Sequence, residues 1–200
     1  MGNPALGPCV LEGERLRLEP LRKHHVEGLL AIGGDPEIWR WLPEELDNRE
    51  TIERFIENAL QCEAAESCYA FAVVRRADGA VLGSTRYMDI DHVNRGVEVG
   101  WTFYTRSAWG GPVNPEAKYL LLRHAFEDWG ALRVALRTDV RNLHSQAAIR
   151  KLGARYEGTL RSHRIRRDGT LRDTVQFSVL REEWPEVREG LLARLGADAG

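Results

Sequence analysis

The alternation of apolar and polar residues predicts several strands and helices in the first half of the chain. Residues 14–19 alternate leucine with charged residues, which is typical of a half-buried strand. Residues 24–32 and 51–65 repeat apolar residues at helical spacing, and the second of these segments carries one apolar stripe. Three strand-like runs follow at residues 69–75, 80–90 and 96–104.

Two capped helices and a hairpin are predicted in the second half. Asn114 and Pro115 indicate an N-cap followed by proline at the first helical position, so a helix is expected from there to about residue 129. Asn142 is expected to cap another helix, which ends before Gly153. Strands are expected at residues 132–139, 155–166 and 171–180, and a helical tail at 182–195 that is interrupted at Pro185.

This order of elements predicts an α+β protein with a mixed sheet and helices on its faces, neither a doubly wound fold nor a barrel. The 200 residues contain no internal repeat or low-complexity stretch, so we expect one domain over residues 1–200. Its core is expected at about 12–186, with a C-terminal helical tail at 182–196. With 43% hydrophobic and 29% charged residues, the chain can form a core without disulfides or a structural metal.

Charge and cysteine content indicate the type of ligand and the cellular compartment. The net charge of −2 combines an acidic first half with a basic second half, and the latter suits a phosphorylated ligand. Three cysteines without a CxxC pair are typical of a reducing compartment. The sequence shows no apolar membrane span and no export signal at its N-terminus, so a cytoplasmic location and no membrane partner are expected.

Two segments carry candidate chemistry. The loop at residues 106–113 contains Gly110 and Gly111 directly before a helix, where free N–H groups and the helix dipole favour an anion. This loop could equally be a plain connector. In the segment 138–154, Ser145 shares a helical face with apolar residues, and its hydroxyl is either functional or simply buried. Asn142 could likewise be no more than the N-cap.

Taken together, these segments resemble the core of the GNAT superfamily of N-acetyltransferases, in its RimJ/RimL-like branch. The resemblance covers about residues 12–186 and is carried by Glu98-Val99-Gly100-Trp101, Trp109-Gly110, Asn114 to Ala117, Asn142-x-x-Ser145, Leu152-Gly153-Ala154, Arg172-Asp173-Thr174 and Glu182-Glu183-Trp184-Pro185. It implies a mostly antiparallel, twisted sheet of about seven strands with a central, splayed parallel pair at residues 96–104 and 132–139. Helices would cover both faces.

The resemblance also implies an acetyl-CoA co-substrate and an amine acceptor, either a protein N-terminus or a small amine. The acyl group would pass by direct attack in a ternary complex, and relatives often form homodimers. Pantetheine would pair with the strand backbone after the two strands diverge at Trp101. Pro112 replaces a small residue of the family's loop and removes one N–H donor. The implied cofactor-binding residues are Trp101, Thr102, Phe103, Arg106, Trp109, Gly110, Gly111, Val113, Asn114, Asn142 and Ser145.

Acetyl transfer to an amine needs a base and an acid. Glu98 is the candidate base, and alternation along its strand puts Glu98, Thr102 and Tyr104 on one face. A solvated glutamate on a half-exposed strand is the plainer interpretation. Ser145 is the first candidate acid for the leaving thiolate, and Tyr104 is the second.

Other features point to chemistry less clearly. The six histidines lack metal-ligand spacing, so no metal is expected. The arginines at residues 161–172 could bind an acidic substrate or RNA, but we interpret them as an exposed hairpin and do not expect a nucleic-acid partner. Trp39 and Trp41 lie in a loop where this superfamily builds its acceptor pocket. The main alternative to an enzyme is a catalytically silent acyl-CoA-binding or regulatory module.

Overall fold

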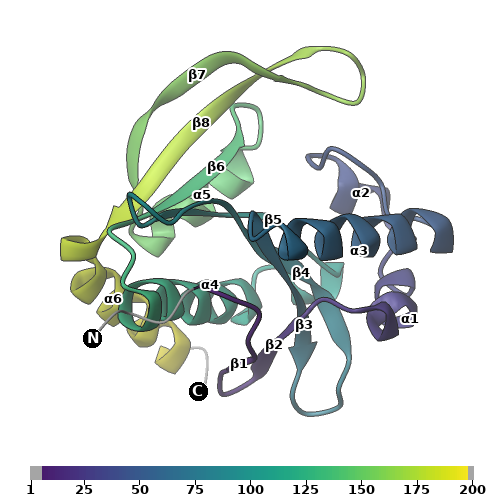
Figure 1. The fold of residues 1–200 in the computed structure, drawn as a ribbon, viewed down its shortest axis with the longest axis horizontal. Helices are drawn as coiled ribbons and strands as arrows, with labels where there is room; N and C mark the ends of the chain where they lie inside the picture. Colours follow the sequence, from purple (N-terminus) through teal and green to yellow (C-terminus); the bar gives the residue numbers. More distant parts are fainter. Residues whose placement is uncertain (1–5, 198–200) are drawn as a thin grey trace.

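One mixed sheet of eight strands organises the molecule in the computed structural model, which describes residues 6–197 (Figure 1). The strand order is β1-β2-β3-β4-β5-β6-β8-β7, and only β5 and β6 run parallel. The predicted sheet with a central parallel pair is therefore confirmed, with the short β1 as an addition. The strands are β1 (Leu11–Glu12), β2 (Leu16–Pro20), β3 (Cys68–Arg75), β4 (Val81–Asp91), β5 (Gly96–Tyr104), β6 (Arg133–Asp139), β7 (Arg155–Ile165) and β8 (Leu171–Leu180).

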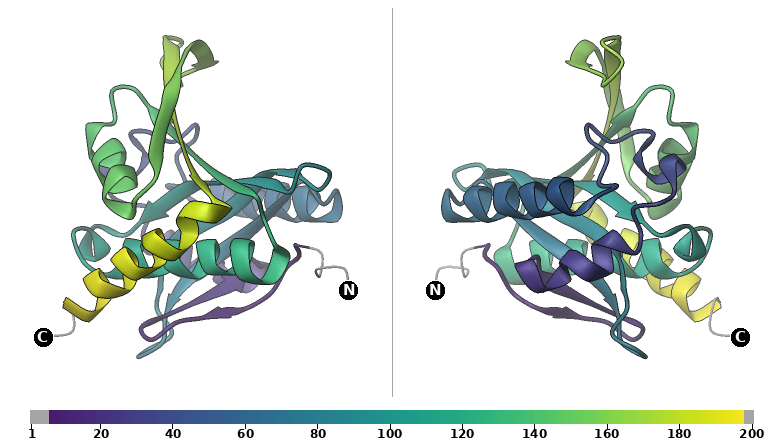
Figure 2. Two further views of the ribbon diagram at one scale, coloured as in Figure 1. Left: turned by 90° about the vertical axis from the view of Figure 1, so that its left-hand side faces the viewer. Right: turned by 90° about the vertical axis from the view of Figure 1, so that its right-hand side faces the viewer.

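Helices cover both faces of this sheet, as predicted, and enclose two hydrophobic clusters (Figure 2). One cluster joins the sheet to the helices α4, α5 and α6, and the other joins it to α1, α2 and α3. Phe71 and Phe177 are fully buried in the first, and Ile52 and Phe55 are buried in the second. The helices are α1 (Val26–Leu30), α2 (Pro36–Trp39), α3 (Arg49–Ala64), α4 (Val113–Arg123), α5 (Leu143–Leu152) and α6 (Trp184–Ala197).

Three features of the helices differ from the prediction. Helix α4 begins at Val113, with Pro112 rather than Asn114 in the N-cap position. Pro185 lies in the first turn of α6 and does not interrupt it, because a proline there blocks no hydrogen bond that the helix needs. The segment that follows α4 to Trp129 is a π-helix, so the predicted length is right and its geometry is new.

Helix α4 is fixed to the β1–β2 turn through one buried carboxylate. Oε1 of Glu116 accepts the N–H groups of Arg15 at 2.8 Å and of Leu16 at 3.1 Å. A Cβ on Gly13 would lie 2.3 Å from the same oxygen, so the turn needs glycine to approach this closely. The start of α4 is thereby held against the sheet.

The parallel pair separates early. Strands β5 and β6 are paired only from Gly96–Arg133 to Glu98–Ala135. Beyond that point β5 stays paired with β4, and β6 stays paired with β8 as far as Asp139. The predicted splay is confirmed, but it opens after Glu98 instead of after Trp101.

A β-bulge in β5 accompanies the splay. The register between β4 and β5 shifts between Ser84 and Arg86, and Trp101 has a φ of 47°. An extra residue in a strand reverses the facing of the residues beyond it. Thus Val97, Val99 and Tyr104 belong to the cluster under α4, whereas Phe103 lies in the cluster under α3.

Candidate functional site

The opening between β5 and β6 leaves strand backbone without a neighbour on one side. From Val99 onward β5 has a strand partner only in β4, because pairing with β6 stops at Glu98. Extended ligands add to such an edge through main-chain hydrogen bonds. The geometry can therefore hold an amide-bearing chain such as pantetheine.

The loop before α4 presents free N–H groups next to this opening. Gly110, Gly111, Val113 and Asn114 donate no backbone hydrogen bond to any described residue, whereas the Trp109 N–H is bonded to the Arg106 carbonyl at 3.0 Å. Gly110 has a φ of 75°, which glycine adopts without strain. Four such donors at a helix start are suited to binding an anion, even with Pro112 among them.

The side chains of this loop are already engaged. Arg106 pairs with Asp35, the N-cap of α2, at 2.5 Å, and it lies 5.3 Å from the centre of the Trp109 ring. The Trp109 ring is partly exposed and donates from Nε1 to the Tyr104 carbonyl at 3.0 Å. Arg106 is thus beside the loop, but it must leave Asp35 or share its charge to meet a diphosphate.

The start of α5 lies at the far side of the opening, after β6. Asn142 is its N-cap, and the side chain accepts the Ser145 N–H at 3.0 Å, as predicted. Ser145 is half-buried, and its hydroxyl has no hydrogen-bond partner among the described residues. The Ser145 hydroxyl is therefore free to donate to a ligand in the opening.

Glu98 is a buried carboxyl at the last residue of β5 that pairs with β6. Its Oε2 accepts from Arg137 Nη1 at 2.6 Å, and the same nitrogen also bonds Asp89 at 2.8 Å. Burial raises the pKa of Glu98 to about 7, with Arg137 opposing the shift and Asp89 reinforcing it. A carboxyl that titrates near neutral pH suits a general base.

The predicted shared face of Glu98, Thr102 and Tyr104 is wrong. The bulge at Trp101 turns Tyr104 to the α4 side, where it is buried and its hydroxyl donates to the Asn114 side chain at 3.4 Å. Burial raises the pKa of Tyr104. Tyr104 and Glu98 therefore lie on opposite faces of β5.

A buried lysine under the bulge was missed by the sequence analysis. Lys118 on α4 donates to Thr102 Oγ1 at 2.6 Å and approaches Thr85 Oγ1 at 3.4 Å. Burial lowers the pKa of Lys118 to about 7. The available signal was its helical spacing to Leu121 and Leu122, which are core residues.

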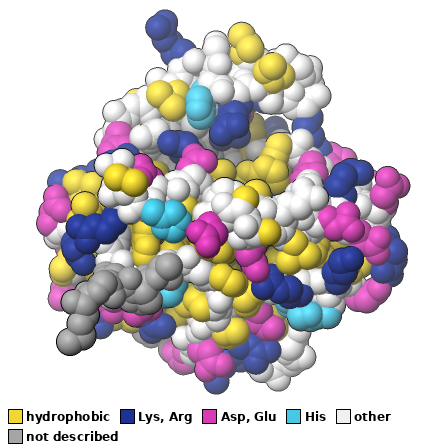
Figure 3. Space-filling view, in the orientation of Figure 1, with side chains coloured by type: hydrophobic (Ala, Val, Ile, Leu, Met, Phe, Trp, Pro, Cys, Tyr) yellow, Lys and Arg dark blue, Asp and Glu magenta, His cyan; other side chains and the backbone are white. Residues whose placement is uncertain are grey.

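Trp39, which the resemblance placed near the acceptor pocket, and Arg166 of the hairpin both hold structural positions. Trp39 is 1% exposed and donates to the Gly33 carbonyl, so it is a core residue within α2. On the hairpin, Arg166 donates from Nε to Asp139 Oδ2 at 2.6 Å and from Nη2 to Asp139 Oδ1 at 3.0 Å, so this arginine is structural rather than free. In Figure 3 the surface is hollowed beneath the β7–β8 hairpin, between that hairpin and α3.

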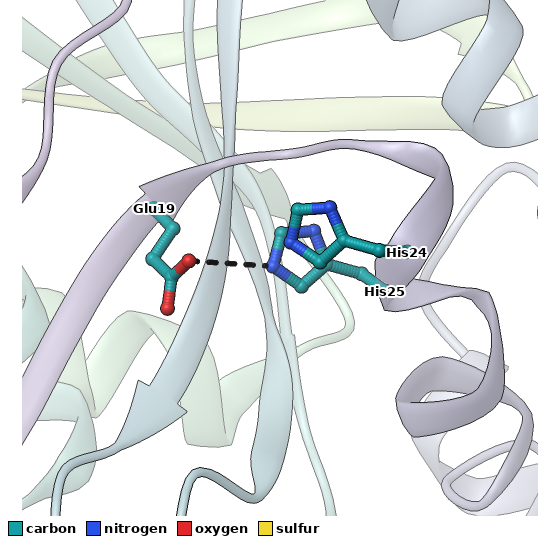
Figure 4. A group of neighbouring side chains, drawn as sticks. All are labelled: Glu19, His24 and His25. Atoms are coloured by element: carbon teal, nitrogen blue, oxygen red, sulfur yellow. Dashed lines mark ion pairs between the residues drawn. The ribbon is translucent and has the colours of Figure 1, made fainter.

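One group in the described part of the chain brings three possible metal-ligand side chains together, namely Glu19, His24 and His25 (Figure 4). Nδ1 of His25 accepts the Arg22 N–H at 3.0 Å, so Nε2 carries the ring proton toward Glu19, 3.8 Å away. Glu19 in turn accepts from Arg17 at 2.6 Å. Hydrogen bonds therefore engage His25 Nδ1 and Glu19 Oε1, two of the atoms that could bind a metal ion.

The sheet thus opens between its two parallel strands, with free amides at the next helix start and a buried carboxyl at the point of opening. Within residues 6–197 no helix has the length and apolar character to cross a bilayer. Residues 15–155 match the sequence family described as the acetyltransferase (GNAT) domain. The chain belongs to the GNAT acetyltransferase family, and its relatives support the RimJ/RimL-like branch.

Three relatives illustrate the likeness. YdaF of Bacillus subtilis (strain 168), assigned as a ribosomal N-acetyltransferase, is 31% identical over 107 residues, which is 54% of this chain and 57% of YdaF. A structure assigned as an acetyltransferase of T. thermophilus is 38% identical, with a TM-score of 0.86 over 96% of this chain and 100% of that one. Mycobacterium smegmatis RimJ in complex with CoA-disulfide shares the fold, with 20% identity and a TM-score of 0.82 over 93% and 94% of the chains.

Proposed function

We propose that this protein transfers an acetyl group from acetyl-CoA to a primary amine, either a protein N-terminus or a small-molecule amine. The observation that carries the proposal is the opening of β5 from β6 after Glu98, beside four N–H groups without backbone partners at Gly110, Gly111, Val113 and Asn114. An opening and an anion site in this arrangement suit the pantetheine arm and the diphosphate of one ligand. Membership of the GNAT acetyltransferase family, together with the CoA-disulfide in the RimJ structure, supports acetyl-CoA as that ligand.

The reaction proceeds by direct attack of the amine on the thioester. The nitrogen lone pair forms a C–N bond to the acetyl carbon, and the C–S bond breaks after a tetrahedral intermediate. Glu98 takes the proton that the nitrogen loses, and the Ser145 hydroxyl donates to the departing sulfur. Unpaired N–H groups of β5 beyond Glu98 stabilise the oxyanion.

The protonation state of the acceptor decides how much a base contributes. An α-amine with a pKa of about 8 is roughly 10% neutral at pH 7, which costs about 1.4 kcal/mol. A lysine amine with a pKa of about 10.4 costs about 4.6 kcal/mol at the same pH. We therefore expect an α-amine to be the better acceptor and a lysine amine to depend more strongly on Glu98.

Isothermal titration with acetyl-CoA, combined with thiol release over a panel of amines, tests the function. Binding of acetyl-CoA together with amine-dependent CoASH release is the expected result. Binding without release for any amine would identify a silent acyl-CoA-binding module. Absence of acetyl-CoA binding would contradict both assignments.

Ser145→Ala is expected to lower kcat by about 10-fold, because a thiolate leaving group comparable to Cys, with a pKa of about 8.5, needs only a weak acid. The Kd for acetyl-CoA should change little, since the Asn142 cap bonds the Ser145 backbone and not its hydroxyl. Stopped-flow turnover and titration calorimetry measure the two quantities. A loss confined to affinity would make Ser145 a binding residue.

A further inference from the structure

Arg86 is a buried cation without a carboxylate partner. It lies on β4, is 6% exposed, and its Nε and Nη2 atoms are buried with no hydrogen-bond partner among the described residues. No described carboxylate lies within the 4.0 Å of an ion pair. Buried charges are normally paired, because leaving water without compensation is costly.

The surroundings of Arg86 compensate its charge only in part. The guanidinium carbon lies 4.3 Å from the centre of the Trp101 ring and 4.8 Å from that of Phe55, so cation–π attraction contributes. Desolvation lowers the pKa of Arg86, and the groups that oppose this shift are Cys68, Cys62 and the more distant Glu44. Burial raises the pKa of Cys68 to about 12, so this neighbour is a neutral thiol.

Arg86 and Glu98 flank one glycine on the same face of the sheet. Arg86 is paired with Gly100 across the β4–β5 ladder, and Glu98 precedes Gly100 by two residues. A Cβ at Gly100 would lie 3.0 Å from Met88 Sδ and 3.2 Å from Glu98 Oε1, so the absence of a side chain at Gly100 lets both groups lie close to the strand. Arg86 is the diagonal cross-strand neighbour of Glu98, and such residues lie about 7–8 Å apart in an antiparallel ladder.

We propose that the acceptor carries a carboxylate a few bonds from its reacting amine and that Arg86 binds this carboxylate. This inference rests on the proposed function. The Nε–Nη2 edge of a guanidinium matches a carboxylate with two parallel hydrogen bonds, and both atoms are unpaired here. An amine held at Glu98 then places its carboxylate toward Arg86.

Access to Arg86 requires movement of the side chains that cover it. Trp101 is the bulge residue, and its side chain is only half-buried. It is therefore the covering side chain that we expect to move. Once a carboxylate is bound, the aromatic rings exclude water, and the weak screening of such a site strengthens the pair. A neutral acceptor of the same shape leaves Arg86 unpaired and gains nothing from it.

Matched acceptors that differ only in one carboxylate test the proposal. Amino acids are compared with their amides, and short peptides that begin with Asp or Glu are compared with peptides that begin with Asn or Gln. We expect wild-type kcat/KM to favour the carboxylate member by about 10-fold or more in at least one series, mainly through KM. The series that shows the preference identifies the source, a free amino acid or an acidic N-terminus.

Three variants assign the preference to Arg86. In Arg86→Met the ratio within each pair should fall to about one, while the Kd for acetyl-CoA stays unchanged. Arg86→Lys keeps the positive charge but cannot form two parallel hydrogen bonds, so it should retain part of the ratio. Arg54→Met, at an exposed position on α3, is the matched control and should behave as wild type.

The outcomes separate this proposal from the function on which it rests. Equal turnover of both members of every pair by the wild type overturns the carboxylate proposal and leaves acetyl transfer intact. A wild-type preference that persists in Arg86→Met overturns the role of Arg86, provided that circular dichroism shows this variant folded. If Arg86→Met does not fold, the wild-type ratio and Arg86→Lys decide. If none of the amines tested stimulates CoASH release, the proposed function itself is overturned.

Discussion

Glu98→Gln is expected to lower kcat/KM for amine acetylation by about 100-fold, the lower end of what a positioned general base contributes. Glutamine keeps the shape of the side chain and can still accept from Arg137, so the geometry at the start of the opening is conserved. The variant loses only the ability to take a proton. Steady-state kinetics with an α-amine and a lysine amine measure the effect, which should be larger for the lysine amine.

The pH profile gives the sharper measurement. A base acts in its ionised form, and burial raises the pKa of Glu98 to about 7. Wild-type kcat/KM should therefore rise through about pH 7, and the ratio of wild type to variant should rise and level off there. Dividing the two profiles removes the titration of the amine, because both enzymes share that acceptor. A ratio that does not change with pH would contradict the assignment of Glu98 as the base.

Stability supplies the control for Glu98→Gln. The folded-state pKa of Glu98 lies above its ordinary value of 4.5, so the folded state binds the proton more tightly than the unfolded state. The stability from protonated Glu98 is fully present below about pH 4.5 and is lost as pH rises through 7. The glutamine variant has no such loss and should be more stable than wild type at pH 8 in denaturant titrations. A less stable variant would mean that the drop in activity reflects misfolding.

The sequence predicted the fold well wherever periodicity decides it. Strands β4 and β5 and the cap at Asn142 follow from alternation and from capping chemistry, and the structure confirms them. The site was harder to predict, because one residue broke the alternation. Trp101 adopts a positive φ, which aromatic residues rarely do, so the bulge that places Tyr104 on the opposite face from Glu98 had no local signal.

Buried charged residues were the other feature that the hydrophobic pattern of the sequence could not predict. Arg86 and Lys118 were not identified from the sequence as candidate site residues, since Lys and Arg are seldom fully buried. Both lie next to the bulge, one on each face of the sheet, as their contacts with Trp101 and Thr102 show. Their burial depends on how two helices pack on the sheet, and that is a tertiary property. Charged residues at core spacing are therefore worth testing as site residues in a chain such as this one.

Glu116→Ala should cost about 3 kcal/mol of unfolding free energy. The substitution leaves two buried N–H donors without an acceptor, at about 1–3 kcal/mol each. The carboxylate is 2% exposed, and its Oε1 accepts the N–H groups of Arg15 and Leu16. Alanine also leaves a cavity beside Gly13, which adds to the cost. Urea unfolding followed by circular dichroism measures the shift in midpoint.

Glu116→Gln is the matched variant for this measurement. Its amide oxygen can replace Oε1, and its amide nitrogen then takes the place of Oε2, which faces Arg15 Nη1 at 3.7 Å. We therefore expect glutamine to lose the attraction to Arg15 but to keep both backbone hydrogen bonds, and to cost about 1 kcal/mol. A glutamine variant as unstable as the alanine variant would show that the charge, not the two hydrogen bonds, holds α4 against the sheet. Because the free amides of the loop end at this helix start, the alanine variant should also bind acetyl-CoA more weakly than the glutamine variant.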